Sequence, residues 1–195
     1  MVAFPGVFWI VAAMLFCTTA AEWCITAWGA TFVADMVEVS TDTSIALMAG
    51  YFGGVLVGRT LGGRLARRHD PARLLAVALV VTTVGFGVLW PSTTLAPALL
   101  GLLLLGIGLG NLFPMGMAVT VALAPETAAL ASGRAVAVIS LAILLAPFTV
   151  GALADATSLK TALGVVPVML VLAAAALALV RRSARLTEQQ LAPSS

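Results

Sequence analysis

The chain has 195 residues, of which 62% are hydrophobic and only 9% are charged, and its formal net charge is +2. A soluble domain is nearer one half apolar and one quarter charged, and a soluble chain of this length could not cover its surface with so few charges. The composition therefore excludes an ordinary soluble domain and indicates a protein that lies in a lipid bilayer.

Six apolar stretches follow one another along the chain. A helix needs about 20 apolar residues to cross the hydrocarbon core, so six spans use nearly the whole length. The predicted spans are 4–33, 44–65, 74–90, 96–123, 131–154 and 161–180. The first is too long for a cleaved signal peptide and is predicted to remain as a span. Residues 1–182 then form one bundle, and 183–195 form a polar tail in which 187–191 favours a short helix.

The charged residues predict how the bundle is oriented. If the connections alternate between the two sides, one side receives Lys160 with Asp35, Glu38, Asp42 and Asp155. The other receives nine arginines: Arg59, Arg64, Arg67, Arg68, Arg73, Arg134, Arg181, Arg182 and Arg185. Basic residues concentrate on the cytoplasmic side of membrane proteins. Both termini are therefore expected in the cytoplasm, with the chain in a cell membrane, namely a bacterial inner membrane.

Two short strings indicate an internal repeat. Gly63-Arg64-Leu65-Ala66 closes the second predicted span, and Gly151-Ala152-Leu153-Ala154 closes the fifth, 88 residues later. The second and fifth spans end on opposite sides of the membrane. Inverted repeats of this kind are common in transporters, so the pattern predicts an all-α protein of two inverted three-helix repeats.

The glycine- and arginine-rich string at 58–68 resembles the loop signature of the major facilitator superfamily. The strings at 131–135 and 147–155 resemble helix eleven of that family, and the whole chain is similar to its C-terminal half, helices seven to twelve. One position departs from the stronger form of the loop signature, since Arg67 stands where that form has an aspartate. The resemblance implies a central cavity, a small-molecule substrate and a partner, either a missing N-terminal half or a second copy of the chain.

Glu22 is the most informative candidate for a functional residue, because it lies in the middle of the first span. Thr18 and Thr26 lie one turn to either side of it. A charged side chain at this depth is costly, and such acids are often functional. The resemblance places this helix beside the cavity. The functional interpretation is a carboxyl that couples transport to protons or binds a cation. The structural interpretation is a protonated or hydrogen-bonded side chain.

Asn111 lies in the fourth span, directly after three alternating glycines, Gly106, Gly108 and Gly110. The resemblance places it beside the cavity, where its amide would contact substrate. An amide in a membrane helix also commonly bonds to a neighbouring helix, and this alternative stays open. The glycines do not predict a nucleotide loop, because no strand precedes them.

Charged residues at the cytoplasmic ends of the spans are candidates for a gate. They are Arg59, Arg64, Arg67, Arg68, Glu126 and Arg134. In the family resembled, such residues form a charge cluster, and Glu126 is positioned to pair with the arginines of the second connection. Arg59 lies a little inside its helix and can instead extend to lipid phosphate, while the other arginines can simply determine topology.

Four glycines repeat every fourth residue along the second span: Gly50, Gly54, Gly58 and Gly62. Small residues at this spacing let helices approach closely, which predicts tight packing. An alternative is a smooth surface that slides against the missing half.

These features favour one half of a secondary transporter that moves a small solute by alternating access, with proton coupling through Glu22. The alternative is a truncated or non-transporting membrane partner that needs a second six-helix half. An intramembrane enzyme is not expected, since the spans hold neither a nucleophile with a base nor two aspartates. With one histidine, His69, no metal site is expected. No cofactor, catalytic residue or nucleic-acid partner is predicted.

Overall fold

The structure is a computed structural model that describes residues 4–191, and the side chains of residues 4–183. Its elements run in the order α1 (Gly6–Val37), α2 (Thr41–Leu65), α3 (Pro71–Leu89), α4 (Leu95–Ala122), η1 (Pro125–Thr127), α5 (Ala128–Ala156), α6 (Leu159–Ala162) and α7 (Val165–Leu191). Within residues 4–191, six helical segments are long and apolar enough to cross a membrane, with α6 and α7 together forming the sixth. The six-helix prediction is confirmed.

Several helices begin earlier than hydropathy predicts, because their first turns are polar. Ser40 precedes α2 and accepts a hydrogen bond from the backbone N–H of Thr43 at 3.3 Å, and Asp42 lies in the first turn. Asp70 caps α3 in the same way, and Pro71 takes the first helical position. Capping side chains and a proline at this position stabilise a helix start without adding hydropathy.

The sixth span is interrupted, where the sequence analysis predicts one continuous helix over 161–180. Pro167 has no N–H to bond to the carbonyl of Leu163, and that carbonyl instead accepts the N–H of Val166 at 3.0 Å. A proline in the first turn of a helix loses no intrahelical hydrogen bond, and α7 accordingly restarts at Val165, which puts Pro167 in its first turn. Past the predicted span, α7 continues through 187–191, as an extension of the span rather than a separate helix.

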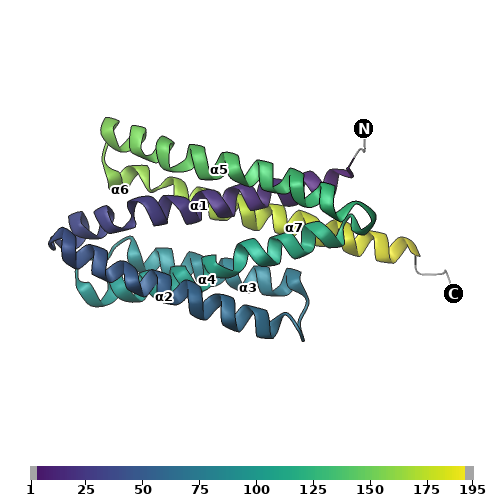
Figure 1. The fold of residues 1–195 in the computed structure, drawn as a ribbon, viewed down its shortest axis with the longest axis horizontal. Coiled ribbons are helices and arrows are strands. Elements are labelled where there is room, and N and C mark those ends of the chain that lie inside the picture. The colour runs from purple at the N-terminus through teal and green to yellow at the C-terminus, as the bar shows by residue number, and fades with distance from the viewer. Residues whose placement is uncertain (1–3, 192–195) are drawn as a thin grey trace.

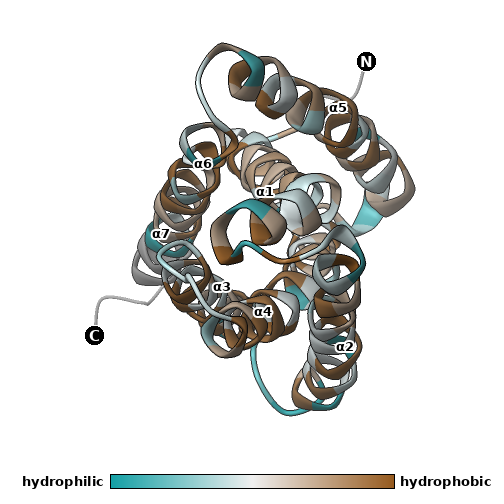
Figure 2. Cartoon of the chain, turned by 90° about the vertical axis from the view of Figure 1, so that its left-hand side faces the viewer, coloured by the Kyte–Doolittle hydropathy of each residue, from teal (hydrophilic) through white to brown (hydrophobic). Residues whose placement is uncertain are grey.

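Each three-helix repeat packs mainly through its first helix against the other repeat. The first helix of each repeat packs against the second and third helices of the other: α1 contacts α5 and α7, and α4 contacts α2 and α3. The remaining contacts follow the same symmetry, with α1 on α2, α4 on α5, α1 on α4 and α3 on α7. Seen end-on, α2 and α5 lie on one side of the bundle and α7 on the other (Figure 2). The predicted inverted repeat is confirmed.

The core is apolar, and so is most of the outer surface. Leu102, Leu105 and Leu109 of α4 are almost fully buried. On α5, in contrast, Leu144 and Phe148 are 70% and 74% exposed. A soluble bundle would cover such positions with charged residues, whereas a helix that faces lipid or a second protein needs none.

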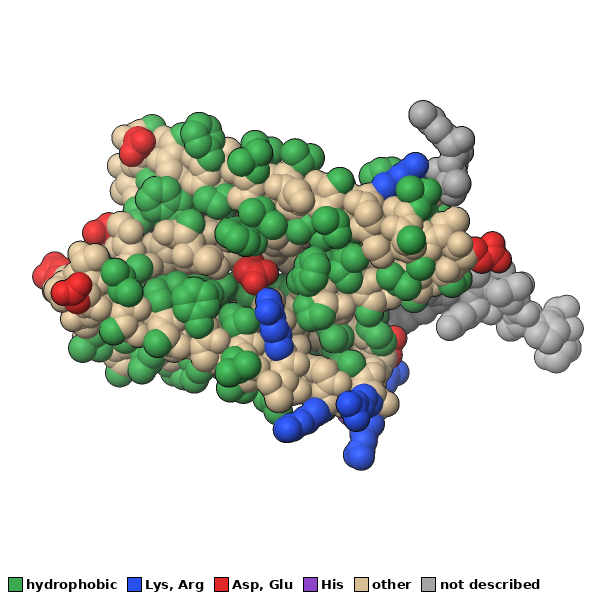
Figure 3. Space-filling view, viewed as in Figure 1, with side chains coloured by type: hydrophobic (Ala, Val, Ile, Leu, Met, Phe, Trp, Pro, Cys, Tyr) green, Lys and Arg blue, Asp and Glu red, His purple; other side chains and the backbone are tan. Residues whose placement is uncertain are grey.

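Charged side chains lie mainly at the two ends of the bundle (Figure 3). Figure 1 shows which elements meet at each end. The acidic end carries the α1–α2 connection and the end of α5. The arginine-rich end carries the α2–α3 connection, the start of α5 and the last turns of α7. A hydrogen bond of 3.0 Å from Arg181 to the carbonyl of Ala72 joins α7 to α3 at this end.

The glycines of the repeated string have different neighbours. On α5, the Gly151 Cα faces the indole of Trp28, and a methyl group added there would lie 2.8 Å from the ring. The same indole donates a hydrogen bond of 2.9 Å to the carbonyl of Pro147. On α2, a methyl group added at the equivalent Gly63 would have no neighbour within 4 Å.

This difference predicts opposite effects for one substitution. Gly151→Ala forces the Trp28 ring to move and is expected to lower the free energy of unfolding by about 1 kcal/mol. Gly63→Ala meets open space and is expected to raise it by up to about 1 kcal/mol through helix propensity. Thermal unfolding of both variants in detergent measures the difference, and equal effects would show that the Trp28 contact is unimportant.

Candidate functional site

Helices α1 and α2 form an antiparallel hairpin whose register two contacts define. The hydroxyls of Thr26 and Tyr51 lie 3.3 Å apart. One turn towards the connection, a methyl group on Gly29 would lie 3.1 Å from the sulfur of Met48. The same register places Val55 level with Glu22, and Arg59 one turn, about 5.4 Å, beyond it.

Glu22 and Arg59 therefore approach each other from neighbouring helices. Glu22 lies near the midpoint of the 32 residues of α1. Its carboxylate interacts electrostatically with the Arg59 guanidinium, and buried Tyr51 lies within electrostatic reach of both. Figure 3 shows one acidic and one basic side chain side by side midway along the bundle, away from the charged ends. Opposite charges at membrane depth stabilise each other because each alone would be costly to bury.

Arg59 also faces a cavity of about 340 Å³ between α2 and α4. The cavity is lined by Arg59, Gly63, Asn111, Phe113, Pro114 and Met115. Arg59 thus lies between Glu22 on one side and the α4 residues on the other. The structure places this arginine with the intramembrane acid, whereas the sequence analysis grouped it with the arginines of the loop.

Asn111 lies at the contact between α4 and α2. Its Nδ2 donates a hydrogen bond of 2.9 Å to the carbonyl of Ile107, and its Oδ1 is buried without a hydrogen-bond partner. The side chain fills the space that a Cβ would occupy at Gly62 and closely approaches Gly58. Asn111 therefore contributes both to helix packing and to the wall of the cavity beside Arg59.

The glycine strip of α2 packs against α4 of the same chain. Gly54 faces the backbone of Leu103, Gly106 and Ile107, while Gly50 faces the side chain of Leu99. The strip is thus covered within this chain and does not form an outer surface that could slide against another half. The α4 glycines alternate in the same contacts: Gly106 and Gly110 approach α2, and Gly108 approaches Thr82 of α3.

The remaining predicted residues do not join this cluster. Thr18 is buried, and its hydroxyl donates to the carbonyl of Leu15 at 3.1 Å. Arg64, Arg67, Arg68 and Glu126 are exposed at the arginine-rich end. Within the part of the chain described with side chains, no salt bridge joins Glu126 to those arginines. Arg134 lies over the ring of Phe4, with its guanidinium carbon 4.8 Å from the ring centre.

Tyr51 is a residue of the cluster that the sequence analysis missed. It is the only tyrosine of the chain, and it is 1% exposed. A short α1–α2 connection would have pointed to it, because an antiparallel hairpin with so short a turn brings Thr26 level with Tyr51. The predicted connection, 35–42, is longer than the observed one and obscured the register. Among the described residues, no group of three histidine, cysteine or acidic side chains that could hold a metal ion occurs.

A carboxylate and a guanidinium on neighbouring membrane helices, beside a cavity, are typical of a secondary active transporter. The bundle has the fold of one six-helix half of such transporters. A family model described as Major Facilitator Superfamily matches residues 4–194, and the chain belongs to this family of transporters rather than to an enzyme family. It is a multi-pass membrane protein.

A solved structure gives the same fold. The chain is similar to the POT family transporter PepTSo, solved as an in meso crystal structure, with a TM-score of 0.77 and 16% sequence identity. The match covers 93% of this chain but 38% of that one, so the chain spans well under half the length of this transporter. No curated protein matches the chain in sequence.

Proposed function

We propose that this chain forms one half of a secondary transporter that moves a small solute by alternating access, and that Glu22 couples this movement to protons. The observation that carries the proposal is the approach of Glu22 on α1 to Arg59 on α2 beside the cavity that Asn111 helps to line. Family membership supports transport as the general activity.

The pair offers a simple coupling step. With Glu22 ionised, its carboxylate holds the Arg59 guanidinium towards α1. A proton on Glu22 removes the negative charge, and Arg59 is then free to turn to a substrate anion or to an acidic group in the opposite half. Release of the proton restores the pair. A change of one charge in this site thus changes which partner Arg59 has, as a coupled conformational change requires.

Uptake into vesicles tests the coupling. The full chain is reconstituted with an inward proton gradient, and the accumulation of a labelled amino acid, a labelled sugar and the cationic dye ethidium is followed. For a solute that accumulates, Glu22→Gln is expected to abolish the dependence on the gradient while downhill exchange persists. Glu38→Gln, an equivalent change at an exposed position at the end of α1, is expected to leave the dependence unchanged. Gradient-driven uptake that survives Glu22→Gln would show that the proton role is wrong.

The second candidate is a non-transporting partner that needs another six-helix half. It is favoured by the 38% coverage of the similar transporter, because one half supplies only one wall of a cavity. If none of the three solutes accumulates with this chain alone, but one does after co-reconstitution with a second half, the chain is a subunit. Six further spans and a Gly-x-Leu-Ala-Asp string in the adjacent upstream reading frame would identify that half. Self-association would instead appear as a dimer by light scattering in detergent.

The arginine-rich end is proposed to face the cytoplasm of a bacterial cell, in agreement with the positive-inside rule. A green fluorescent protein fused after Ser195 is expected to fluoresce, since it folds only on the cytoplasmic side of the inner membrane. A dark fusion of a chain that is present in the membrane would contradict this orientation.

A further inference from the structure

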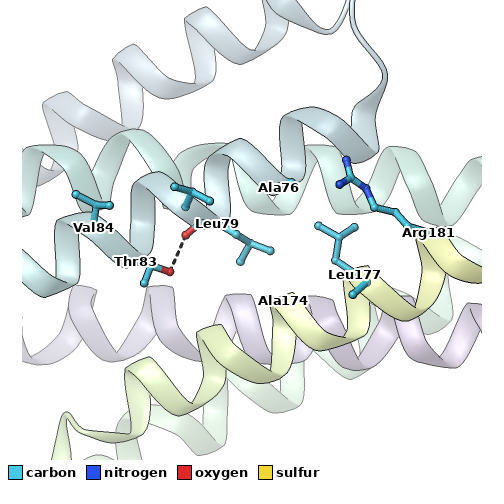
Figure 4. A pocket seen from close by; sticks show the side chains of 9 residues that line it. Ala76, Leu79, Thr83, Val84, Ala174, Leu177 and Arg181 are labelled. Carbon is cyan, nitrogen blue, oxygen red and sulfur yellow. Dashed lines mark hydrogen bonds between the residues drawn. The ribbon is translucent and has the colours of Figure 1, made fainter.

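A groove with a single charged residue lies between α3 and α7, on the opposite side of the bundle from α2 and α5. It has a volume of about 380 Å³. Its lining residues are Ala76, Leu79, Val80, Thr83 and Val84 of α3, and Ala174, Leu177, Ala178 and Arg181 of α7. Figure 4 shows Arg181 at one end of the groove and Val84 at the other.

The groove exists because the helix seam is lined by small side chains. Ala76, Ala174 and Ala178 leave space that larger residues would fill, and the buried side chains of Leu79 and Leu177 form the floor. Thr83 adds no unpaired polar group, since its hydroxyl donates to the carbonyl of Leu79 at 2.8 Å. From Ala76 to Val84 the groove follows α3 for about 12 Å. The groove is therefore apolar along this length, as the binding of a hydrocarbon chain requires.

The end of the groove carries positive charge. The Arg181 guanidinium donates one hydrogen bond, to the carbonyl of Ala72 at 3.0 Å, which holds it at the mouth. A guanidinium has five N–H donors in a planar fork that suits phosphate, so most of its donors are available to a ligand. Arg182 follows Arg181 in the sequence, and Arg73 follows Ala72, so further positive charge lies at the same end together with the acidic Asp70.

We propose that this groove binds an anionic phospholipid from the leaflet that meets the arginine-rich end. One acyl chain lies along the seam between α3 and α7, and the phosphate is bound by Arg181. The excess of arginines at this end favours a lipid with net negative charge over a zwitterionic one. The α1–α7 groove of about 500 Å³ has no charged residue in its lining and therefore lacks the headgroup contact. The inference stands whether or not the chain transports alone.

Native mass spectrometry of the full chain in detergent tests the site, with dioleoyl-phosphatidylglycerol as the probe and dioleoyl-phosphatidylcholine as its zwitterionic counterpart. The wild type is expected to retain one phosphatidylglycerol and to bind it more tightly than phosphatidylcholine. Arg181→Gln is expected to weaken the phosphatidylglycerol complex roughly tenfold, as the loss of one charged hydrogen-bonding group predicts. Arg182→Gln, the exposed neighbour, is expected to leave it unchanged.

A second pair of variants tests the acyl chain. Ala174→Phe fills the α3–α7 groove and is expected to reduce phosphatidylglycerol binding as strongly as Arg181→Gln does. Ala175→Phe, one residue along, fills the α1–α7 groove instead and is expected to leave the complex intact. The proposal is overturned if the wild type retains no lipid, if phosphatidylcholine binds equally well, or if Arg182→Gln weakens binding as much as Arg181→Gln. Equal losses in Ala174→Phe and Ala175→Phe would also place the lipid elsewhere.

Discussion

Gly54→Ala is expected to lower the free energy of unfolding by about 1–3 kcal/mol, as overpacking of a closely packed contact usually does. A methyl group at this position would lie 3.0 Å from the backbone nitrogen of Ile107 and 3.1 Å from the Cα of Gly106, and it would also overlap the carbonyl of Leu103. Backbone atoms cannot turn aside as a flexible side chain can. The α2–α4 pair would therefore have to separate along its length, as a lower midpoint of thermal unfolding in detergent would show.

Gly53 provides the matched control. It precedes Gly54 on the same helix, and a methyl group added to it would have no neighbour within 4 Å. Gly53→Ala is expected to be neutral or to stabilise by up to about 1 kcal/mol, because alanine has the higher helix propensity. If both variants unfold at the same temperature, the glycine strip does not hold α2 against α4.

The second large effect is expected at the Glu22–Arg59 pair. Glu22→Gln leaves Arg59 without its acidic partner at membrane depth, and Arg59→Gln does the reverse. Each single change is expected to lower the free energy of unfolding by about 1–3 kcal/mol, as leaving a polar group without its partner usually does. The double variant is expected to cost less than the sum of the two, with a coupling energy of about 1–2 kcal/mol. Thermal unfolding of the four proteins in one detergent completes this cycle.

The cycle has an internal control in the arginines of the loop. Arg67 is exposed and lies outside the helices, so Arg67→Gln combined with Glu22→Gln is expected to be additive. Additivity for Glu22 and Arg59 as well would mean that the two groups do not interact. Such a result would also remove the basis of the proposed coupling step.

The arrangement of spans could be predicted from the sequence because hydropathy and charge act on each segment separately. The six apolar stretches and the distribution of arginines need no knowledge of neighbours, and the Gly-x-Leu-Ala strings revealed the repeat. Helix ends were less predictable, because caps such as Ser40 and Asp70 add turns without adding hydropathy. The break before α7 depends on Pro167, which lies within an otherwise uniform apolar run.

Contacts between helices could be predicted only in part. The spacing of the α2 glycines indicates a flat face, but it does not say that α4 covers that face. The alternating glycines of α4 likewise show small residues on two sides, without showing that Gly106 approaches α2 and Gly108 approaches α3. Glu22 stood out because a lone acid in an apolar span is rare. Nothing in the sequence singled out Arg59 as the partner of Glu22. That pairing depends on the register of the α1–α2 hairpin, and the register depends on how short the connection is.

The packing of each repeat's first helix against the other repeat has a consequence for how the chain is assembled during synthesis. When the first three helices have entered the membrane, α2 and α3 still lack α4, the helix on which both pack. The glycine face of α2 is then exposed to lipid until α4 is inserted. The main contacts of α1 form later still, when α5 and α7 are inserted. A version of this chain that ends near residue 90 would thus hold α1, α2 and α3 without a common core. Such a fragment should be a substrate for membrane proteases, whereas one that continues past residue 122 already contains the compact unit of α2, α3 and α4.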